Sequence, residues 1–261
     1  MSDLSWKTAI TEIQPNQVRL RGYRIDELMG EITFAQGIFL ALRGELPSPE
    51  VGRLIDAMLV SSIDHGATPP SALAAHTVAS TGAPLNAAVA AGVLSINKHH
   101  GGAIYDCMGA LKQIIDDAQQ SGQSIETQAD QVIDEFKAQK KRIAGLGHRV
   151  HTNDPRTARL FALAEEAGIS GPGVQAMRAL ADGYAQRGKN LPINVDGAIA
   201  ALLVDLDMPQ ELANAFFIMA RVPGLVAHVY EEQTRQRPMR RIHPTDHSYD
   251  GPPPRALEER P

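Results

Sequence analysis

The sequence has one cysteine, few aromatic residues and no long apolar run. Cys107 alone cannot form an intrachain disulfide, which fits a reducing compartment, and we expect a cytoplasmic location. Aromatic residues make up 5% of the chain, while alanine, leucine and isoleucine are plentiful, and this composition favours packed helices over sheets. The first residues lack a signal-peptide pattern, and no apolar run approaches the roughly 18 residues of a membrane span. We therefore expect no membrane partner.

Metal-binding motifs and a net positive charge are also missing. There is no HExxH motif and no cysteine pair, so the nine histidines predict no metal site. The net charge of −5 argues against nucleic acid as the main partner. Basic residues are nevertheless clustered, with seven Lys or Arg and one acid in residues 137–159, and four Arg in residues 235–241. Such clusters often form only a solvated surface, but these adjoin other candidate site residues and we interpret them as functional.

Helical periodicity and capping residues predict an all-α fold. Ser48-Pro49 has the form of a helix start, with a serine N-cap and proline at the first helical position, followed by apolar residues at helical spacing. Only residues 18–21 alternate like a strand. We expect helices over residues 48–62, 71–80, 84–97, 104–119, 124–141, 155–167, 172–187, 194–206, 209–221 and 224–236.

Residues 145–156 concentrate glycine, histidine and arginine in one segment that reads as a loop entering a helix. The glycines allow the atoms of another molecule to approach the backbone closely. Asp154 and Pro155 form a typical helix start. Arg156 would then lie in the first helical turn, where the helix dipole disfavours a cation, and this placement suggests an anionic ligand. The segment therefore predicts a loop that binds carboxylates and moves a proton.

Other candidate residues each allow a structural interpretation. His65 and His100 precede glycines, and a single such histidine is more often structural than functional. In the segment 194–197, either Asn194 or Asp196 would cap the following helix. Arg221 ends an apolar run, where the dipole of a helix C-terminus would stabilise it, or where it would need a partner or an exit to water.

Taken together and in order, these motifs resemble the citrate synthase superfamily. They are His-Gly, His-Gly-Gly, Gly-His-Arg-Val with Asp-Pro-Arg, Asn-Val-Asp-Gly, and Ala-Arg with a downstream histidine, and the resemblance runs from about Tyr23 to Tyr249. The compact length, Asp64-His65-Gly66 and the ending His243-Pro244…Ser248-Tyr249 resemble the branch of citryl-CoA lyase and of the C-terminal module of ATP citrate lyase. The resemblance implies a large helical domain, residues 1–103 and 204–261, which forms the dimer, and a smaller mobile helical domain, residues 104–203, which carries the CoA site and the catalytic aspartate.

The same resemblance implies roles for individual residues. His100, His148 and Asp196 would be catalytic, and carboxylates of the substrate would be bound by His65, Arg156, Arg221 and, from the partner subunit, Arg241, with Arg237 as the alternative. Coenzyme A would lie along the backbone of residues 143–147, which are Ile143, Ala144, Gly145, Leu146 and Gly147. The basic residues 137–149 would face its phosphates, and Arg149 would reach a phosphate or a substrate carboxylate. An arginine supplied in trans implies a homodimer at minimum, and a homotetramer remains open.

The residue types at these positions are those that the implied reaction requires. Forming a carbon nucleophile from acetyl-CoA requires a carboxylate base, here Asp196, and a hydrogen-bond donor to the thioester oxygen, here His100. His148 would polarise the ketone of oxaloacetate, and in the cleavage direction these roles reverse. We therefore expect cleavage of citryl-CoA to acetyl-CoA and oxaloacetate, with CoA as part of the substrate and no tightly bound cofactor. The alternatives are a citrate synthase, or a relative that condenses another acyl-CoA with a 2-oxo acid, and a non-catalytic helical binding protein.

Overall fold

The computed structural model describes residues 6–147 and 154–240. It confirms a mainly helical fold and adds one small antiparallel sheet, of strand order β1-β2-β3. The strands are β1 (Thr11–Gln14), β2 (Gln17–Leu20) and β3 (Tyr23–Arg24). The helices are α1 (Ile25–Leu28), α2 (Phe34–Arg43), α3 (Pro49–Ser61), α4 (Pro70–Ser80), α5 (Leu85–Leu94), α6 (Ala103–Ser121), α7 (Ile125–Ala138), α8 (Pro155–Glu166), α9 (Pro172–Gln186), α10 (Val195–Asp205) and α11 (Ala213–Arg235), with a short 3-10 helix at Gln210–Leu212.

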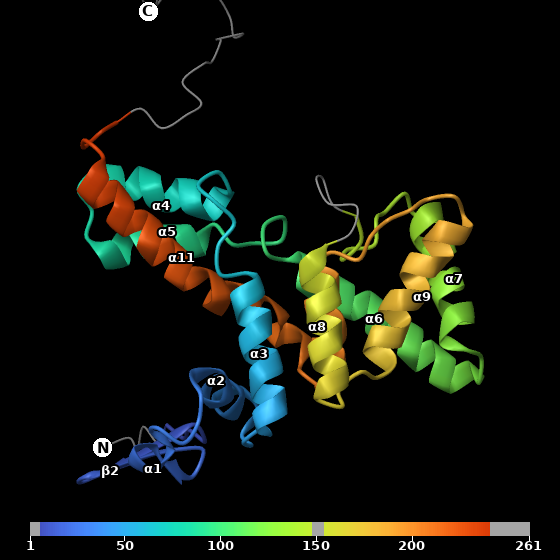
Figure 1. The fold of residues 1–261 in the computed structure, drawn as a ribbon, viewed down its shortest axis with the longest axis horizontal. Helices are drawn as coiled ribbons and strands as arrows, with labels where there is room; N and C mark the ends of the chain where they lie inside the picture. Colours follow the sequence, from blue (N-terminus) through green and yellow to red (C-terminus); the bar gives the residue numbers. More distant parts are fainter. Residues whose placement is uncertain (1–5, 148–153, 241–261) are drawn as a thin grey trace, which may run out of the picture.

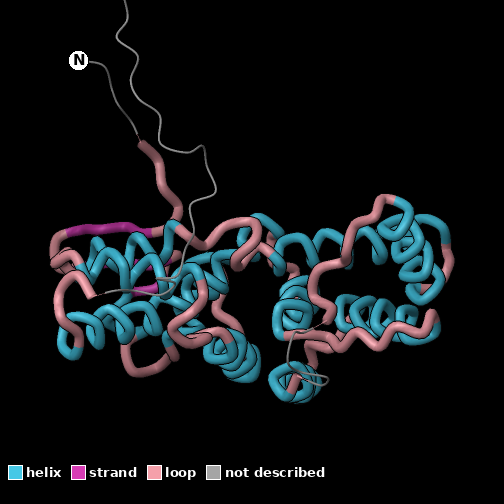
Figure 2. The backbone as a smooth tube through the Cα atoms, turned by 90° about the horizontal axis from the view of Figure 1, so that it is seen from above, coloured by secondary structure: helices cyan, strands magenta, loops and turns pink. Residues whose placement is uncertain are grey.

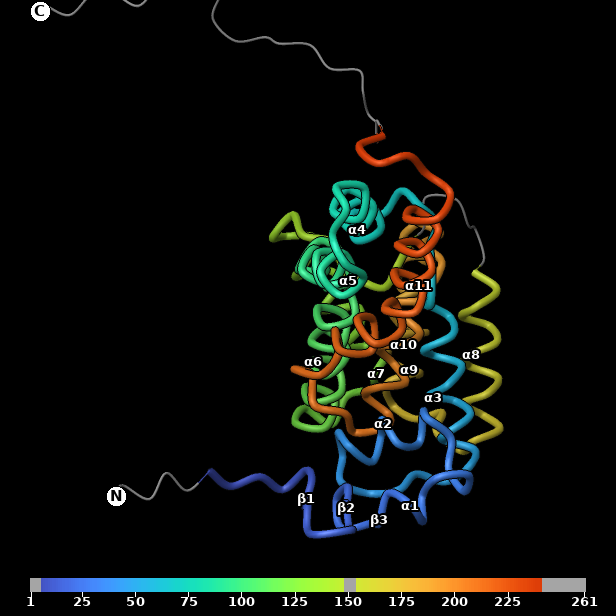
Figure 3. The backbone as a smooth tube through the Cα atoms, turned by 90° about the vertical axis from the view of Figure 1, so that its left-hand side faces the viewer, coloured from blue at the N-terminus to red at the C-terminus, as the bar shows by residue number. Residues whose placement is uncertain are grey.

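The helices form two groups along the long axis of the molecule. α4, α5 and α11 pack together at one end, and α6, α7 and α9 at the other, with α3 and α8 between them (Figure 1). Seen from above, helices make up both ends, and the sheet lies at the margin of one of them (Figure 2). A view along the long axis shows β1–β3 and α2 on the side opposite to α4 (Figure 3).

Helix α10 lies at the centre of the second group, against α6, α8 and α9. Its residues from Gly197 to Leu203 are all buried, which suits a helix of small and branched apolar side chains. The main core extends from Ala35 on α2 through α6, α9 and α10 to Phe217 on α11. Because this core crosses the expected boundaries near residues 104 and 203, the division into two domains stays a prediction.

A second, smaller core is built largely from alanine. It joins α4, α5 and α11 and consists of Ala75, Ala79, Ala88, Leu225 and Val229. Small residues allow close helix contact, and a Cβ on Gly92 of α5 would lie 2.9 Å from Leu225 Cδ1 and 3.0 Å from the Ser71 carbonyl oxygen. Both helices are close to the candidate site, since α11 carries Arg221, which lines it, and Ser71 of α4 contacts His100, which also lines it.

The structure confirms some of the expected elements and differs from others. The helices expected at 209–221 and 224–236 are one helix, α11, with Pro223 inside it. A proline has no N–H and so removes one backbone hydrogen bond of the helix. Buried residues on both sides of Pro223, Arg221 and Leu225, keep the helix continuous despite this loss. The strand expected near residues 18–21 is confirmed as β2, and its partners β1 and β3 were not expected. Helix α2 was not expected, although Thr33 and Gln36 form a capping box at its start.

Residues Gln210–Arg235, which include α11, are long and apolar enough to cross a membrane by length and composition. This finding differs from the expectation that no apolar run has that length, because the helix continues through Pro223. In this structure α11 packs against α3, α4, α5 and α6, and it carries the buried charged residues Arg221 and Glu232. Its apolar residues therefore serve, at least in part, as core.

Candidate active site

A pocket of about 280 Å³ brings together predicted site residues that are far apart in the sequence. Five of them line it, namely His65, His100, Arg156, Asp196 and Arg221, together with Ser62, Lys98, His99, Gly101, Ala103, Asn194, Val195 and Phe217. Within residues 6–147 and 154–240, no group of three or more His, Cys, Asp or Glu side chains could hold a metal ion. Three predicted site residues, His148, Arg149 and Arg241, lie outside the described residues.

Asp196 lies in the first turn of α10 and is half-buried. Asn194, not Asp196, caps this helix, because the Asn194 side chain accepts a hydrogen bond from the Gly197 N–H at 3.1 Å. Burial raises the pKa of Asp196, and the positive charges of Arg156 and Arg221 oppose this rise without cancelling it. A carboxyl group with a raised pKa, aimed into a polar pocket, is suited to proton transfer.

His100 follows α5 and its ring is turned towards the start of α4. Its Nε2 lies 2.9 Å from Ser71 Oγ and 3.4 Å from the Ser71 backbone nitrogen. A backbone N–H can only donate, so we assign Nε2 as the acceptor and the proton to Nδ1. Burial lowers the pKa of His100, and the charges of Arg221 and His65 lower it further. At neutral pH the ring is therefore an uncharged donor.

Arg221 is a buried cation in the interior of α11. It is 4% exposed, its Nε donates to the Ser62 carbonyl oxygen at 3.2 Å, and its guanidinium lies 4.7 Å from the ring centre of Phe217. The helix continues for fourteen residues beyond it, to Arg235, so stabilisation by a helix C-terminus is the wrong explanation for this charge. The remaining donors of the guanidinium are suited to bind a carboxylate.

Arg156 lies in the first turn of α8, as expected, but its position has a cause within the protein. Asp154 caps α8, and its two carboxylate oxygens bind Arg156 Nε at 3.0 Å and Nη2 at 2.8 Å. The Asp154 side chain is 1% exposed and that of Arg156 is 29% exposed, so the carboxylate is shielded from water while the guanidinium reaches the surface. Asp154 therefore accounts for a cation at this place without a ligand, and the placement alone does not indicate an external anion. Arg156 also lines the pocket, and its role in carboxylate binding stays a prediction.

The glycine loop packs against the start of α10. Gly145 and Gly147 have φ angles of +86° and +81°. A Cβ on Gly145 would lie 2.7 Å from Gly197 Cα, so the close approach at this glycine is made by the protein itself. Hydrogen bonds join the loop to residues 192–194, from Gly147 N to Pro192 O at 2.7 Å and from Asn194 Nδ2 to Gly147 O at 2.9 Å.

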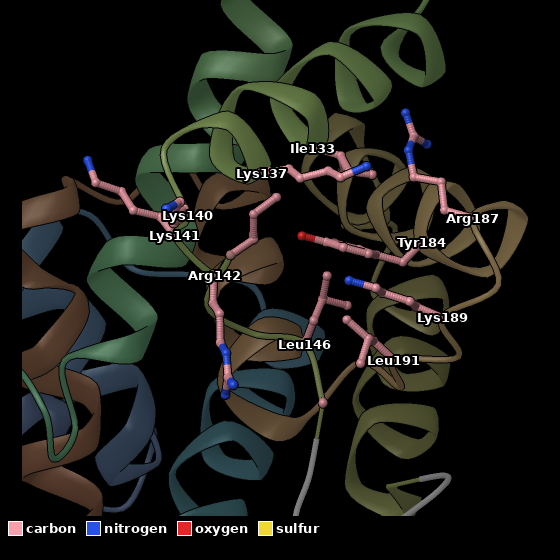
Figure 4. Close-up of a pocket in the computed structure, with 12 residues that line it drawn as sticks. Ile133, Lys137, Lys140, Lys141, Arg142, Leu146, Tyr184, Arg187, Lys189 and Leu191 are labelled. Carbon is pink, nitrogen blue, oxygen red and sulfur yellow. The ribbon is translucent and has the colours of Figure 1, made fainter.

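A larger pocket of about 800 Å³ borders this loop. Six cationic residues line it, namely Lys137, Lys140, Lys141, Arg142, Arg187 and Lys189, with Ile133, Ile143, Leu146, Gly147, Tyr184 and Leu191 (Figure 4). Of the residues expected along CoA, Ile143, Leu146 and Gly147 line this pocket, whereas Ala144 and Gly145 are not among the residues that line it.

The close-up shows how the charges of the larger pocket are arranged. The Tyr184 hydroxyl and the Lys189 ammonium group point inwards, whereas the Arg187 guanidinium turns away from the centre (Figure 4). Arg187 is paired with Asp130 and, at 3.4 Å, with Asp134 of α7. Tyr184, Arg187 and Lys189 were not predicted from the sequence. The segment Arg187-Gly188-Lys189, just after α9, was the available signal.

Comparison with known proteins places this site in a family. Residues 31–244 match the model of the citrate synthase C-terminal domain. The solved structure of citryl-CoA lyase from Hydrogenobacter thermophilus has 44% sequence identity and a TM-score of 0.87, with 97% of each chain covered. ATP citrate lyase from Methanothrix soehngenii, solved with citrate and coenzyme A, has 21% identity and a TM-score of 0.82, with 97% of this chain and 43% of that chain covered.

Curated sequences agree with this placement. Citrate synthase of Haloferax volcanii is 28% identical over 213 residues, which are 80% of this chain and 54% of that protein. This chain thus spans about half the length of that relative. By the match to the family model over most of its residues, the chain belongs to the citrate synthase family.

Proposed function

We propose that the protein cleaves citryl-CoA into acetyl-CoA and oxaloacetate. The observation that carries this proposal is that two pockets of different chemistry are linked through the hydrogen bond between Asn194 and Gly147. The basic pocket touches the loop at Gly147, and the site pocket touches Asn194, which donates a hydrogen bond to Gly147. A ligand with phosphates at one end and carboxylates at the other suits this pair of pockets. The 44% identity to a citryl-CoA lyase over 97% of each chain supports the choice of reaction.

Coenzyme A fits the chemistry of the larger pocket. Lys137, Lys189 and the neighbouring basic residues would bind its diphosphate and 3′-phosphate through charge-assisted hydrogen bonds. Leu146, Leu191 and Tyr184 offer apolar surface for the rest of the cofactor. In this proposal coenzyme A arrives and leaves as part of the substrate and products.

Carbon–carbon cleavage follows from the groups in the smaller pocket. In this proposal His148, which lies outside the described residues, takes the proton from the tertiary alcohol of citryl-CoA. The alcohol oxygen becomes the ketone of oxaloacetate, the bond between the carbons breaks, and its electron pair becomes the enolate of acetyl-CoA. The Nδ1–H of His100 donates to the enolate oxygen, where one such hydrogen bond contributes roughly 3 kcal/mol. Asp196 returns a proton to the enolate carbon, and its raised pKa favours the protonated form that this step needs. His65, Arg156 and Arg221 hold the carboxylates of the four-carbon product.

We also propose that the protein is a homodimer, formed through the end of the molecule that carries α5. This helix, Leu85–Leu94, has no charged side chain, yet only Ala88 and Gly92 are buried in one copy. Leu94 is 77% exposed and Leu85 44% exposed. A helix that is apolar all round is normally buried on all sides, and a second copy would bury it.

A condensing enzyme is the second candidate, because the same pair of groups serves either direction. The deciding experiment is a substrate panel in which citryl-CoA and malyl-type thioesters are compared with the condensation of oxaloacetate and acetyl-CoA. Cleavage of citryl-CoA, measured as oxaloacetate and acetyl-CoA formed, is the expected result. Rapid release of free CoA from oxaloacetate and acetyl-CoA would instead identify a synthase. Asp196→Ala and His100→Ala should abolish turnover with an unchanged helical circular dichroism spectrum, and full activity in either would refute the assigned site.

A further inference from the structure

A second cluster of ionisable groups lies beside the site pocket, between α4, α11 and the loop after α3. Asp64 belongs to this loop, and one of its carboxylate oxygens lies 2.9 Å from Nε2 of His228 on α11. Its other oxygen accepts a hydrogen bond from the Gly66 N–H at 2.8 Å. The carboxylate therefore bonds to α11 and also closes a tight turn around His65, the residue between Asp64 and Gly66.

The loop that carries His65 is also held along its earlier residues. Arg156 Nη1 donates to the Ser61 carbonyl oxygen at 3.3 Å, and Arg221 Nε donates to the Ser62 carbonyl oxygen at 3.2 Å. Gly224 of α11 lets the loop approach closely, because a Cβ there would lie 2.4 Å from the Ile63 carbonyl oxygen. The loop is thus pinned up to Asp64, and His65 follows directly.

His228 is itself supported by a buried network. Its ring lies 5.1 Å from the ring of His76 at an interplanar angle of 67°. His76 Nδ1 lies 3.0 Å from Glu232 Oε2, and Arg240 Nε and Nη2 each lie 2.6 Å from the Glu232 oxygens. His76 and Glu232 are 5% and 3% exposed. The ring of His76, which is buried among these groups, restricts the position of the His228 ring by direct contact.

We propose that Asp64 and His228 are a positioning pair that holds His65 towards the carboxylate of the four-carbon substrate. Neither residue of the pair lines the site pocket, whereas His65 does, so the pair acts through His65. His65 is exposed and lies in a loop, and an unrestrained side chain there would lose conformational entropy each time it bound a carboxylate. The inference rests on the proposed function, since it takes His65 as a carboxylate-binding residue.

A double-mutant cycle tests whether the pair acts through His65. The dissociation constant of oxaloacetate is measured by calorimetry without CoA, and the kcat and KM of citryl-CoA cleavage are measured beside it. We expect His65→Ala and His228→Ala each to weaken oxaloacetate binding about 10-fold, with KM changed more than kcat, since small displacements in a site have effects of this order. His228→Gln, whose amide can still reach Asp64, should recover most of the affinity. His65→Ala/His228→Ala should bind no more weakly than His65→Ala alone.

Glu231→Gln is the matched control, because Glu231 lies on the same helix and pairs at 2.6 Å with Arg235 rather than with the loop. It should leave binding unchanged. Additive losses in the double variant, or unchanged binding in His228→Ala, would overturn the positioning role. A wild-type protein that binds oxaloacetate but cleaves no citryl-CoA would refute the proposed lyase activity, and the double-mutant cycle on oxaloacetate binding would still test the positioning pair. A wild-type protein that does not bind oxaloacetate would overturn both proposals.

Discussion

A glycine can be needed in the loop beside α10 for its backbone conformation or for the lack of a side chain, and alanine substitutions at Gly145 and Gly147 distinguish these two reasons. Both residues have positive φ angles, +86° and +81°, which an alanine adopts at a cost of about 1 kcal/mol. Their surroundings differ. Among the residues that the structure describes, a Cβ on Gly147 would meet only Leu191 Cδ2, at an ordinary 3.8 Å. A Cβ on Gly145 would lie 2.6 Å from Cys107 Sγ and 2.7 Å from Gly197 Cα.

The two substitutions should therefore differ in their effect on stability. Gly147→Ala should lower the free energy of unfolding by about 1 kcal/mol, from the backbone conformation alone. Gly145→Ala adds overpacking, which typically costs about 1–3 kcal/mol, so the total should be about 2–4 kcal/mol. The Gly197 atom belongs to the backbone of a buried helix and cannot turn aside as a side chain can.

Urea unfolding followed by circular dichroism, at one fixed protein concentration, measures both values. Cys107→Ala combined with Gly145→Ala provides an internal test, because it removes the sulfur contact and leaves the contact with Gly197. We expect Gly145→Ala to lower the free energy of unfolding less in the Cys107→Ala background than in the wild-type background, but still to lower it. Equal losses for the two glycine variants, or complete recovery in the combined variant, would refute the reasoning from close packing.

Three further predictions concern charge and assembly. Asp196→Asn should be more stable than wild type at neutral pH, because burial raises the folded-state pKa of Asp196 and disfavours its charged form. This advantage should shrink as the pH falls through the raised pKa. A difference in urea midpoint that stays constant across pH would contradict the prediction. Arg240→Met should lower the free energy of unfolding by about 3 kcal/mol at pH 7, because it leaves the Glu232 carboxylate buried without its bidentate partner. The Arg240 hydrogen bond lowers the pKa of Glu232, so this loss should diminish as pH falls from the ordinary glutamate pKa through the lowered one, and a denaturation series that shows no such decline would count against the pair. Leu94→Glu should leave the monomer folded, since Leu94 is 77% exposed, while light scattering should show loss of the proposed dimer; an unchanged mass would place the interface elsewhere.

Local signals in the sequence predicted much of the helical structure. Ser48 and Asp154 each cap the helix that the sequence assigned to them, because capping depends on a few neighbouring residues. For the helix after residue 194 the sequence left Asn194 and Asp196 as alternatives, and the structure gives Asn194 as the cap. The continuous α11 was not predictable in this way. Pro223 signals a break, and only contacts with residues far away in the sequence hold the helix together across it.

For the site residues, too, the sequence indicated what depends on local motifs and missed what depends on contacts between distant segments. The motifs identified five residues that the fold brings to one pocket. They could not show that Arg156 is held by Asp154, since a cation near a cap and a cation near a ligand look alike in sequence. Nor could they identify Lys189, which joins the basic pocket because the segment after α9 runs beside the glycine loop.

The balance of charges around Asp196 connects the fold to the proposed reaction. Its place in the first turn of α10 and the nearby Arg156 and Arg221 all favour a carboxylate, yet burial outweighs them and the pKa is raised. A bound dicarboxylate would add negative charge and occupy donors of Arg221. We therefore expect the pKa of Asp196 to rise further when the four-carbon unit is bound. In the cleavage direction this favours the protonated form of Asp196 until the enolate forms, so the burial of Asp196 at the start of α10 favours the residue as a proton donor.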